Sequence, residues 1–396
     1  MSGRIELVFG LVGPIGCPIQ DAIDALSAAL KGVDYKPVPI HLSSEMDRLL
    51  YAKGAPIPNS GESQLENKIK KGNAVREAFG NDSVLAAEAI RQIIEFRRSV
   101  AFKSGETNDQ KLDDMAAVPL DQHAFIVHQL KRPEEIKLLI QAFGKNFIQV
   151  SVVSPVEARR QAVVSRVRAD QKGWDNNRCE KHADHLVNID QNEKLEKRGQ
   201  RISKIFHLGD VFLNAASESS LTKSADRFVE ALFGKNNIGP TRDEFGSYMA
   251  KAASLRSVDL SRQVGAAITT PDGDIISIGC NEVPKFGGGN FWDEDDEKSK
   301  KRDIDLGAEA NKSEVNRIVF NFLEILKNEK LISGDVSPEQ IMENSSHRKA
   351  IKESLVAGIT EYGRMVHAEM NAISDAVRLG RSVRGGNNFC YHISLS

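Results

Sequence analysis

The sequence predicts an α/β protein of two domains, residues 1–235 and residues 240–396. In the first part, strand-like segments alternate with amphipathic helices, which favours a parallel, doubly wound sheet. The first strand runs into a glycine turn and then a helix, as in phosphate-binding α/β domains. The second part reads as helix, hairpin and helix, and residues 234–237 have the composition of a linker between the two parts.

The composition is that of an ordinary globular protein, with 40% hydrophobic and 27% charged residues in a chain of 396. The net charge of −2 provides no general attraction to nucleic acid, which is therefore not expected as a partner. No apolar run is long enough for a membrane span, and no signal peptide is recognisable. The four scattered cysteines (Cys17, Cys179, Cys280 and Cys390) argue against a disulfide framework and for a reducing cytoplasm.

A glycine-rich turn follows the first expected strand, residues 6–13. Gly10, Gly13 and Gly16 lead into a helix that Pro18 opens. The loop amides and the helix N-terminus predict a weak nucleotide-binding site. A Walker A loop has a lysine after its last glycine, and none follows Gly16, so kinase chemistry is not expected. The alternative is a tight turn that only packs a helix on a sheet.

Further elements complete the first domain. Strands are expected at residues 36–42, 124–128, 147–153 and 205–213, and helices at 63–98 (broken at 80–82), at 132–144 and from 155 onward.

Three groups of side chains in this domain have both a functional and a structural interpretation. Three lysines, at positions 68, 70 and 71, could meet phosphate or form a solvated face. Four arginines, between positions 159 and 168, could form a lid that clamps phosphate, or they could lie on an exposed helix. The cysteine and histidines are spaced to share one side of a helix, but they lack a fourth zinc-type ligand nearby, which favours a structural role. The groups are Lys68, Lys70 and Lys71; Arg159, Arg160, Arg166 and Arg168; and Cys179, His182 and His185.

The second domain begins at about Pro240. A helix is expected at residues 244–256, and two strands, 263–269 and 275–281, are joined by a hairpin turn. A long insertion follows, with an acidic run and a helix at 314–328. Long insertions in compact domains tend to be functional or mobile.

His367, Ala368 and Glu369 open the last expected helix with the pattern His-x-Glu. A histidine can supply a neutral imidazole to zinc. A glutamate two residues later points another way from the helix and can face a water that the metal activates. Zinc nucleobase deaminases combine this pattern with a later Pro-Cys-x-x-Cys. Taken alone, His367 could equally be a capping or core histidine.

Residues 255–266 (LRSVDLSRQVGA), Asn281 after the hairpin, and His367-Ala368-Glu369 together resemble the deoxycytidylate deaminase family. The whole chain resembles its two-domain subgroup, which has a degenerate P-loop, kinase-like first domain and a cytidine-deaminase-like α-β-α second domain. The resemblance implies zinc-dependent hydrolytic deamination of a deoxycytidine nucleotide, dCMP or dCTP. It also implies a homo-oligomer and a role in bacterial defence against phage by nucleotide depletion.

Residue by residue, the resemblance implies the following site. His367 would be a Zn²⁺ ligand, and Glu369 would shuttle protons between the zinc-bound water and the cytosine ring. The backbone of Ala368 would meet the pyrimidine carbonyl, and Asn281 would hold the sugar or base. A pocket floor would be formed by Val264, Gly265 and Ala266.

The sequence departs from the family after Gly385. By the deaminase pattern, Pro-Cys-x-x-Cys is expected roughly thirty residues beyond the histidine, but residues 386–396 do not match it. One imidazole cannot hold a zinc that needs three protein ligands, and Cys390 and His392 have the wrong spacing to replace the cysteines. The chain is therefore expected to be an inactive or impaired deaminase. Its second domain would be incomplete, with an unpaired sheet edge and an exposed apolar face.

A frameshift would explain this departure. One choice of synonymous codons for residues 386–396, read one base later, encodes Ala-Thr-Ile-Phe-Val-Thr-Thr-Phe-Pro-Cys. That is the strand and the first half of the cysteine motif that the family has. Our hypothesis is one extra base after the Gly385 codon. The nucleotide sequence of the gene tests it, and a downstream frame without Cys-x-x-Cys would refute it.

Two other functions remain open. In the first, the chain is a regulatory protein whose first domain binds a purine or pyrimidine nucleotide and whose deaminase half is vestigial. In the second, it deaminates polynucleotides, against which the net charge and the lack of a basic, aromatic-rich strip argue.

Overall fold

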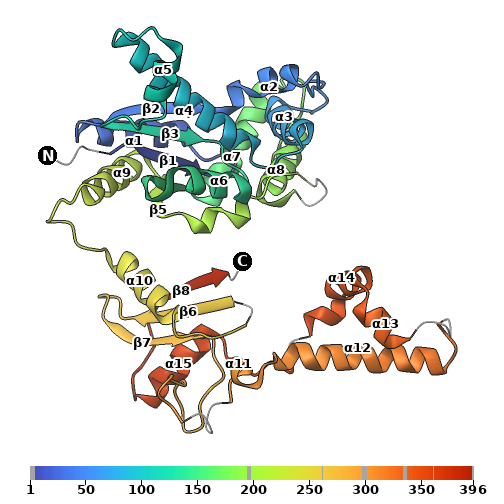
Figure 1. The fold of residues 1–396 in the computed structure, drawn as a ribbon. Helices are drawn as coiled ribbons and strands as arrows, with labels where there is room; N and C mark the ends of the chain where they lie inside the picture. The colour runs from blue at the N-terminus through green and yellow to red at the C-terminus, as the bar shows by residue number, and fades with distance from the viewer. Residues whose placement is uncertain are drawn as a thin grey trace. The chain divides into compact units, whose positions relative to one another are not determined.

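The computed structural model describes residues 5–193, 198–260, 262–296, 301–332, 337–359 and 361–394. The chain divides into two compact units, Met1–Ile238 and Gly239–Ser396 (Figure 1). The expected linker lies next to this division. Among the described residues, no helix combines the length and the apolar character that crossing a membrane requires.

The first unit is built on a five-stranded sheet in which every pair of neighbours is parallel. Its order is β2 (Lys36–His41), β3 (His123–His128), β1 (Leu7–Val12), β4 (Phe147–Val153) and β5 (Val211–Asn214). All residues of β1 and β3 are buried, as expected of a parallel sheet that is covered on both faces. The predicted parallel, doubly wound sheet is confirmed.

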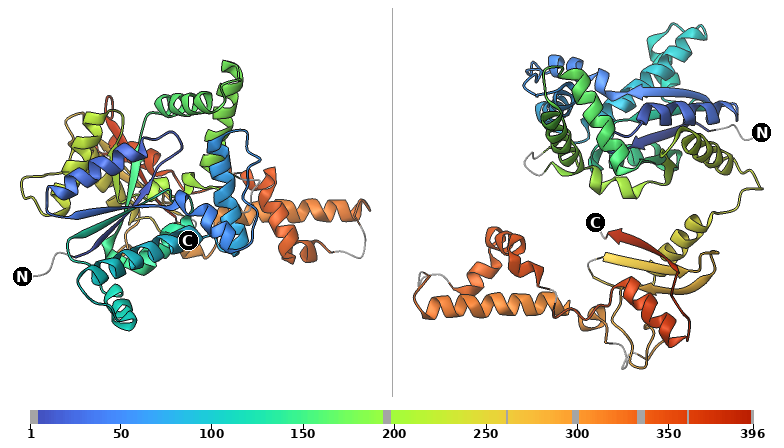
Figure 2. Two further views of the ribbon diagram at one scale, coloured as in Figure 1. Left: turned by 90° about the horizontal axis from the view of Figure 1, so that it is seen from above. Right: turned by 180° about the vertical axis from the view of Figure 1, so that it is seen from behind.

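Helices cover both faces of this sheet (Figure 2). Leu7, Phe9 and Leu11 of β1 pack in one core cluster with α1 (Ile19–Lys31) and α9 (Glu218–Leu232). Val8 and Val12 point to the other face and pack in a cluster with α4 (Val84–Lys103) and α6 (Pro133–Phe143). This alternation follows from the two-residue period of a strand.

The other helices of the unit are α2 (Met46–Ala52), α3 (Gln64–Phe79), α5 (Asp109–Ala116), α7 (Val156–Asp170) and α8 (Asn176–Asn192). The predicted break at residues 80–82 is confirmed, because α3 ends at Phe79 and Gly80 adopts a left-handed φ of 62°. A third apolar cluster joins α3, α7 and α8 through Ile69, Val163 and Cys179.

The last strand of the unit is shorter than the predicted segment 205–213. Residues 202–204 and 206–208 form 3₁₀ turns instead, η3 (Ile202–Lys204) and η4 (Phe206–Leu208). Asp210 then aligns the chain with β4, because its backbone N–H donates to the Gln149 carbonyl at 2.9 Å and its carboxylate accepts from the Gln149 N–H at 2.8 Å. Strand β5 begins only after this contact.

The second unit is an α-β-α arrangement. Strands β6 (Arg262–Thr269) and β7 (Ile275–Cys280) form an antiparallel hairpin, and β8 (Asn387–Ser394) pairs antiparallel with the other side of β6. Helices α10 (Arg242–Ser254) and α15 (Ala368–Arg378) pack on opposite faces of this sheet (Figure 1). Helix α15 exposes three apolar side chains, Met370, Ile373 and Val377.

The insertion between β7 and α15 is mostly helical. It holds α11 (Asp303–Leu306), α12 (Ala310–Asn328), α13 (Pro338–Glu343), α14 (Ser345–Glu353) and the 3₁₀ turn η5 (Leu355–Gly358). The predicted helix 314–328 is contained in α12.

Helices α10 and α15 both approach the sheet at glycines. A Cβ on Gly265 would lie 2.0 Å from the Ala250 carbonyl oxygen on α10, and one on Gly279 would lie 2.4 Å from the Ala368 carbonyl oxygen on α15. Because these are backbone atoms, we expect Gly265→Ala to lower the free energy of unfolding by about 1–3 kcal/mol or more. Chemical denaturation measures this, with Gly358→Ala as the control, since a Cβ there meets no atom within 4 Å. Equal effects of the two substitutions would contradict the packing argument.

Candidate functional site

The first unit contains a cavity of about 280 Å³ beyond the carboxyl ends of β1 and β3. This is the edge of a parallel sheet at which α/β proteins usually bind ligands. Its size is near the lower end of the range for small-molecule sites. The wall is largely apolar and includes Leu11, Ile15, Ile23, Met46, Ile69 and Leu85.

The glycine turn forms one side of the cavity, with Gly13 and Gly16 in the lining. Gly16 has a φ of 86°, and a Cβ there would lie 2.3 Å from the Arg159 carbonyl oxygen, so the turn lies directly against α7. Gly10 does not line the cavity. It lies within β1, where a Cβ would meet the Phe147 ring at 2.6 Å, which gives this glycine a packing role.

The thiol in the turn is not suited to nucleophilic chemistry. Burial raises the pKa of the Cys17 thiol to about 11, although the nearby Arg159 and Lys131 act in the opposite direction. Its Sγ donates a hydrogen bond to the Val152 carbonyl at 3.4 Å. Cys17 therefore holds the turn on β4.

A lysine from another strand stands at the glycine turn. Lys131 follows β3, and its Nζ donates to the Gly13 carbonyl at 3.1 Å and to Asp190 Oδ1 at 2.7 Å. The second oxygen of Asp190 accepts from the Ile15 backbone N–H at 2.6 Å. Asp190 is almost fully buried and lies on α8. A carboxylate–ammonium pair thus ties the turn to β3 and α8.

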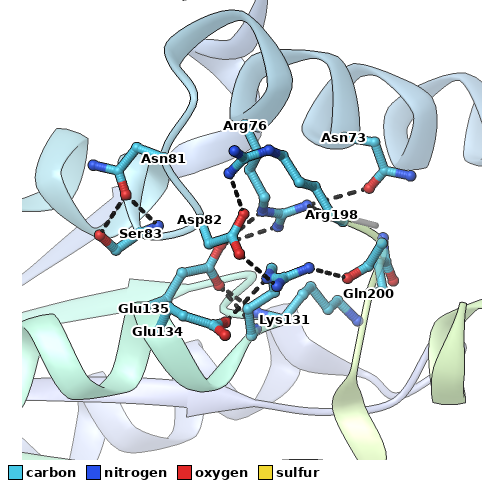
Figure 3. Close-up of polar contacts among 12 residues, drawn as sticks. Asn73, Arg76, Asn81, Asp82, Ser83, Lys131, Glu134, Glu135, Arg198 and Gln200 are labelled. Atoms are coloured by element: carbon cyan, nitrogen blue, oxygen red, sulfur yellow. Dashed lines mark hydrogen bonds and ion pairs between the residues drawn. The ribbon is translucent and has the colours of Figure 1, made fainter. Parts of the chain in front are cut away.

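A buried network of arginines and carboxylates positions the wall beside Lys131 (Figure 3). Arg76 of α3 pairs with Glu135 of α6 at 3.0 Å, and both side chains are fully buried. The other carboxylate oxygen of Glu135 accepts from the backbone N–H of Lys131 at 2.7 Å. Removing one partner of such a pair costs about 3–5 kcal/mol, so this network fixes the chain that carries Lys131.

The same network holds the segment at residues 198–200 against the wall. Asp82 accepts from Arg198 at 2.5 Å (Figure 3). Asp82 also accepts from Arg132 at 2.8 Å, and Arg132 donates to the Gly199 carbonyl at 2.7 Å. Gln200, the next residue, lines the cavity.

Only some of the candidate cations face the cavity. Lys68 and Arg166 line it and are exposed, and they have no ion-pair or hydrogen-bond partner among the described residues. Lys70 pairs with Glu66 at 2.9 Å, and Lys71 pairs with Asp47 at 2.8 Å. Arg160 pairs with Asp184 at 2.6 Å, the Arg159 guanidinium donates to the Ser154 carbonyl, and Arg168 does not line the cavity.

Three buried side-chain atoms of the wall lack hydrogen-bond partners among the described residues. Among the described residues, five buried side-chain nitrogen or oxygen atoms make no hydrogen bond, and three belong to the cavity lining: His128 Nδ1, Gln129 Oε1 and Gln200 Oε1. Unpartnered polar atoms of this kind are uncommon in native proteins and call for an explanation such as an additional partner. Because these atoms are shielded, a ligand would reach them after rotation of the side chains.

In the group Cys179, His182 and His185, the first two side chains have structural contacts. Cys179 is fully buried in the cluster between α3, α7 and α8. His182 Nε2 shares a hydrogen bond of 2.9 Å with Ser63 Oγ, the N-cap of α3. Burial lowers the pKa of His182, against the nearby Glu66. Over the described residues, no group of three histidine, cysteine or acidic side chains could hold a metal ion.

In the second unit, the residues assigned to the zinc site lie at the start of α15. His367 is the exposed N-cap, and Glu369 is in the first turn. Cys390 of β8 donates from its Sγ to Glu369 Oε1 at 3.1 Å. Burial and the adjacent Glu369 raise the pKa of the Cys390 thiol to about 12.

The residues present do not fit a catalytic zinc. A catalytic zinc needs three protein ligands grouped around it. His367, Glu369 and Cys390 do not form a metal-binding group within the described part of the chain. The side chain of His392 lies outside the described residues.

The residues assigned to substrate binding have other contacts. The Asn281 side chain accepts from the Val264 N–H at 2.7 Å and donates to Asp259 at 3.0 Å and to the Arg262 carbonyl at 2.9 Å. It therefore clamps the loop before β6 to the end of β7.

The expected pocket floor is divided between two faces of the sheet. Val264 and Ala266 pack with the buried Ala368 of α15. Gly265 faces α10 on the opposite side. The three residues do not form one continuous surface, because successive side chains of a strand point to opposite faces.

Lys131, Asp190, Arg76 and Gln200 were not singled out from the sequence. A signal existed for Lys131, since it follows a buried strand and the ends of parallel strands meet at one edge of the sheet. No local pattern marks Asp190, which lies 175 residues from its partner Ile15.

The His41–His128 pair at the ends of β2 and β3 predicts a pH effect. The two rings share a hydrogen bond of 2.6 Å, and burial, with His41 as a second cause, lowers the pKa of His128 from 6.5 to about 4. Between pH 6.5 and 4 the unfolded chain binds a proton that the folded chain does not. The free energy of unfolding should therefore fall by up to ~3 kcal/mol as the pH decreases through this window.

Denaturation at several pH values measures this effect. His128→Gln should flatten the dependence, whereas His207→Gln, at an exposed position, should not. An unchanged slope in His128→Gln would contradict the assignment.

No protein-family model matches the chain, and no curated protein matches it. Similar solved structures include an uncharacterized protein from Eubacterium ventriosum ATCC 27560, a shikimate kinase from Bacteroides thetaiotaomicron and a gluconokinase from Sinorhizobium meliloti 1021. Their identities are 11%, 10% and 9%, and their TM-scores are 0.28, 0.28 and 0.25. They cover 57%, 57% and 59% of this chain and 98%, 98% and 99% of their own. Scores this low carry no argument about function, and the α/β assignment is based on the parallel sheet itself.

Proposed function

We propose that the first unit binds a nucleotide in the cavity beside the glycine turn. The observation that carries this proposal is the combination of an apolar wall with two cations, Lys68 and Arg166, that have no protein partner within the described chain. An apolar body with a few placed polar groups is the usual composition of a small-molecule site.

The base of a nucleotide suits the apolar wall of the cavity, and its phosphates suit the two cations. A base would contact apolar side chains such as Ile23 and Met46, with Gln129 and Gln200 as polar groups in the same wall. Phosphates would meet Lys68 and Arg166, whose side chains are exposed and can keep the phosphates partly solvated. Phosphoryl transfer is not part of the proposal, because no lysine follows Gly16.

Alanine substitutions test the phosphate contacts. Each of Lys68→Ala and Arg166→Ala should weaken the binding of a nucleoside triphosphate by about tenfold, since a hydrogen bond to a charged group contributes about 1.5–3 kcal/mol. Isothermal titration with a panel of ribo- and deoxyribonucleotides, dCTP included, measures the affinity. Matched controls are Lys70→Ala on α3 and Arg168→Ala on α7, which do not line the cavity. If the controls weaken binding equally, or if no nucleotide binds, the proposal fails.

A second candidate function is cytosine-nucleotide deamination by the second unit, with dCMP or dCTP as substrate and nucleotide depletion during phage infection as its role. It is favoured by His367 and Glu369 lying together at the start of a helix that packs on the hairpin. Since the residues present do not complete a zinc site, we propose that this chain carries an impaired deaminase unit. The regulatory alternative, in which only the first unit binds a nucleotide, is consistent with that state.

Metal content and turnover test this second candidate. The purified protein should contain substoichiometric zinc and show no deamination of dCMP or dCTP, because a catalytic zinc needs three protein ligands. His367→Ala and Glu369→Ala should change neither result. One zinc per chain that is lost in His367→Ala, together with turnover that is lost in Glu369→Ala, would contradict the proposed impairment.

A further inference from the structure

An anionic side chain of the protein itself, that of Asp190, lies at the glycine turn. Asp190 Oδ2 lies 2.6 Å from the Ile15 nitrogen and accepts its N–H. Asp190 Oδ1 lies 2.7 Å from Lys131 Nζ. The carboxylate is almost fully buried, and the residue lines the cavity together with Ile15 and Lys131.

These contacts are of the kind that a phosphate makes in a glycine-rich loop. Such loops bind phosphate through backbone N–H groups, with a lysine supplying a positive charge. Here one backbone N–H and one ammonium converge on a carboxylate instead. Lys131 also donates to the Gly13 carbonyl at 3.1 Å, so this cation is held against the turn.

The local charge opposes a second anion at this position. Asp190 and Lys131 cancel each other, and a phosphate brought to the turn would face the buried Asp190 carboxylate at close range. Like charges at contact distance in a partly buried site repel each other strongly. Lys68 and Arg166 line the same cavity without carboxylate partners among the described residues.

We propose that Asp190 occupies the phosphate position of the glycine turn, and thereby closes it to phosphate and directs the phosphates of a bound nucleotide to Lys68 and Arg166. The closure of the turn to phosphate is inferred from the contacts of Asp190 alone. The redirection of the phosphates to Lys68 and Arg166 rests on the proposed nucleotide binding. Asp190 is thus a specificity-determining residue that sets the orientation of the ligand.

Substitution of Asp190 should open the turn. In the full-length protein, Asp190→Asn and Asp190→Ala should each raise the affinity for inorganic pyrophosphate at least tenfold over the unaltered chain, because Lys131 is then free to bind an added anion. The double variant Asp190→Ala, Lys131→Ala should lose this gain. It is preferred to Lys131→Ala alone, which would leave the buried Asp190 without its partner. Isothermal titration measures the affinity, and circular dichroism and thermal unfolding confirm the fold.

Asp184→Asn is the matched control. Asp184 lies on the same helix, pairs with Arg160 at 2.6 Å and does not line the cavity, so the substitution makes the same change in net charge elsewhere. A gain in pyrophosphate affinity of equal size in Asp184→Asn would overturn the proposal. So would an absence of gain in folded Asp190 variants, or nucleotide binding that weakens when Asp190 is neutralised.

A second measurement applies if the Asp190 variants do not fold. In the unaltered chain, the binding affinity should rise from the nucleoside to the nucleoside triphosphate. This rise should disappear in the double variant Lys68→Ala, Arg166→Ala. A rise that persists at tenfold or more would place the phosphates at the turn and overturn the proposal. If the unaltered chain binds no nucleotide but Asp190→Asn gains pyrophosphate affinity, the closed turn stands and the proposed function fails. If nucleotide binding depends on Lys68 and Arg166 but the folded Asp190 variants gain no pyrophosphate affinity, the proposed function stands and the closed turn fails.

Discussion

The contact between Asp190, Lys131 and the Ile15 N–H joins three parts of the first unit that are remote in the chain. It connects the glycine turn after β1, the segment after β3 and the helix α8. An almost fully buried carboxylate requires a partner, because an isolated charge in the interior is very costly. The positions of these three segments are therefore coupled, and the shape of the cavity depends on that coupling.

The network around Glu135 extends the same constraint to α3 and α6. Its carboxylate accepts both from the Arg76 guanidinium and from the backbone that carries Lys131. Removing one partner of such a buried pair leaves an uncompensated charge, so Arg76, Glu135 and the segment that carries Lys131 are held together. Lys68 and Arg166 have no partner in the part of the chain that the structure describes. They differ in this from the paired charges around them, and this contrast is the basis of the nucleotide-binding proposal.

The two units differ in how closely their candidate sites match the chemistry expected of them. In the first unit a cavity is present, and the unexpected feature is the carboxylate in the turn. In the second unit the helix, the hairpin and the His-Ala-Glu start are present, but His367, Glu369 and Cys390 form no metal-binding group within the described residues. Asn281 and Gly265, assigned to the substrate, serve instead to join β6 to its neighbours.

The sequence by itself determined the parallel sheet, the break at Gly80, the hairpin and the start of the last helix, because each depends on local periodicity or turn chemistry. It overestimated the strand before Asn214, since residues 202–204 and 206–208 take 3₁₀ turns and the chain aligns with β4 only from Asp210 onward. Tertiary structure alone decided which charges meet at the cavity. Asp190 and Ile15 are separated by 175 residues, and no local pattern reports a contact that is made only when distant segments pack together.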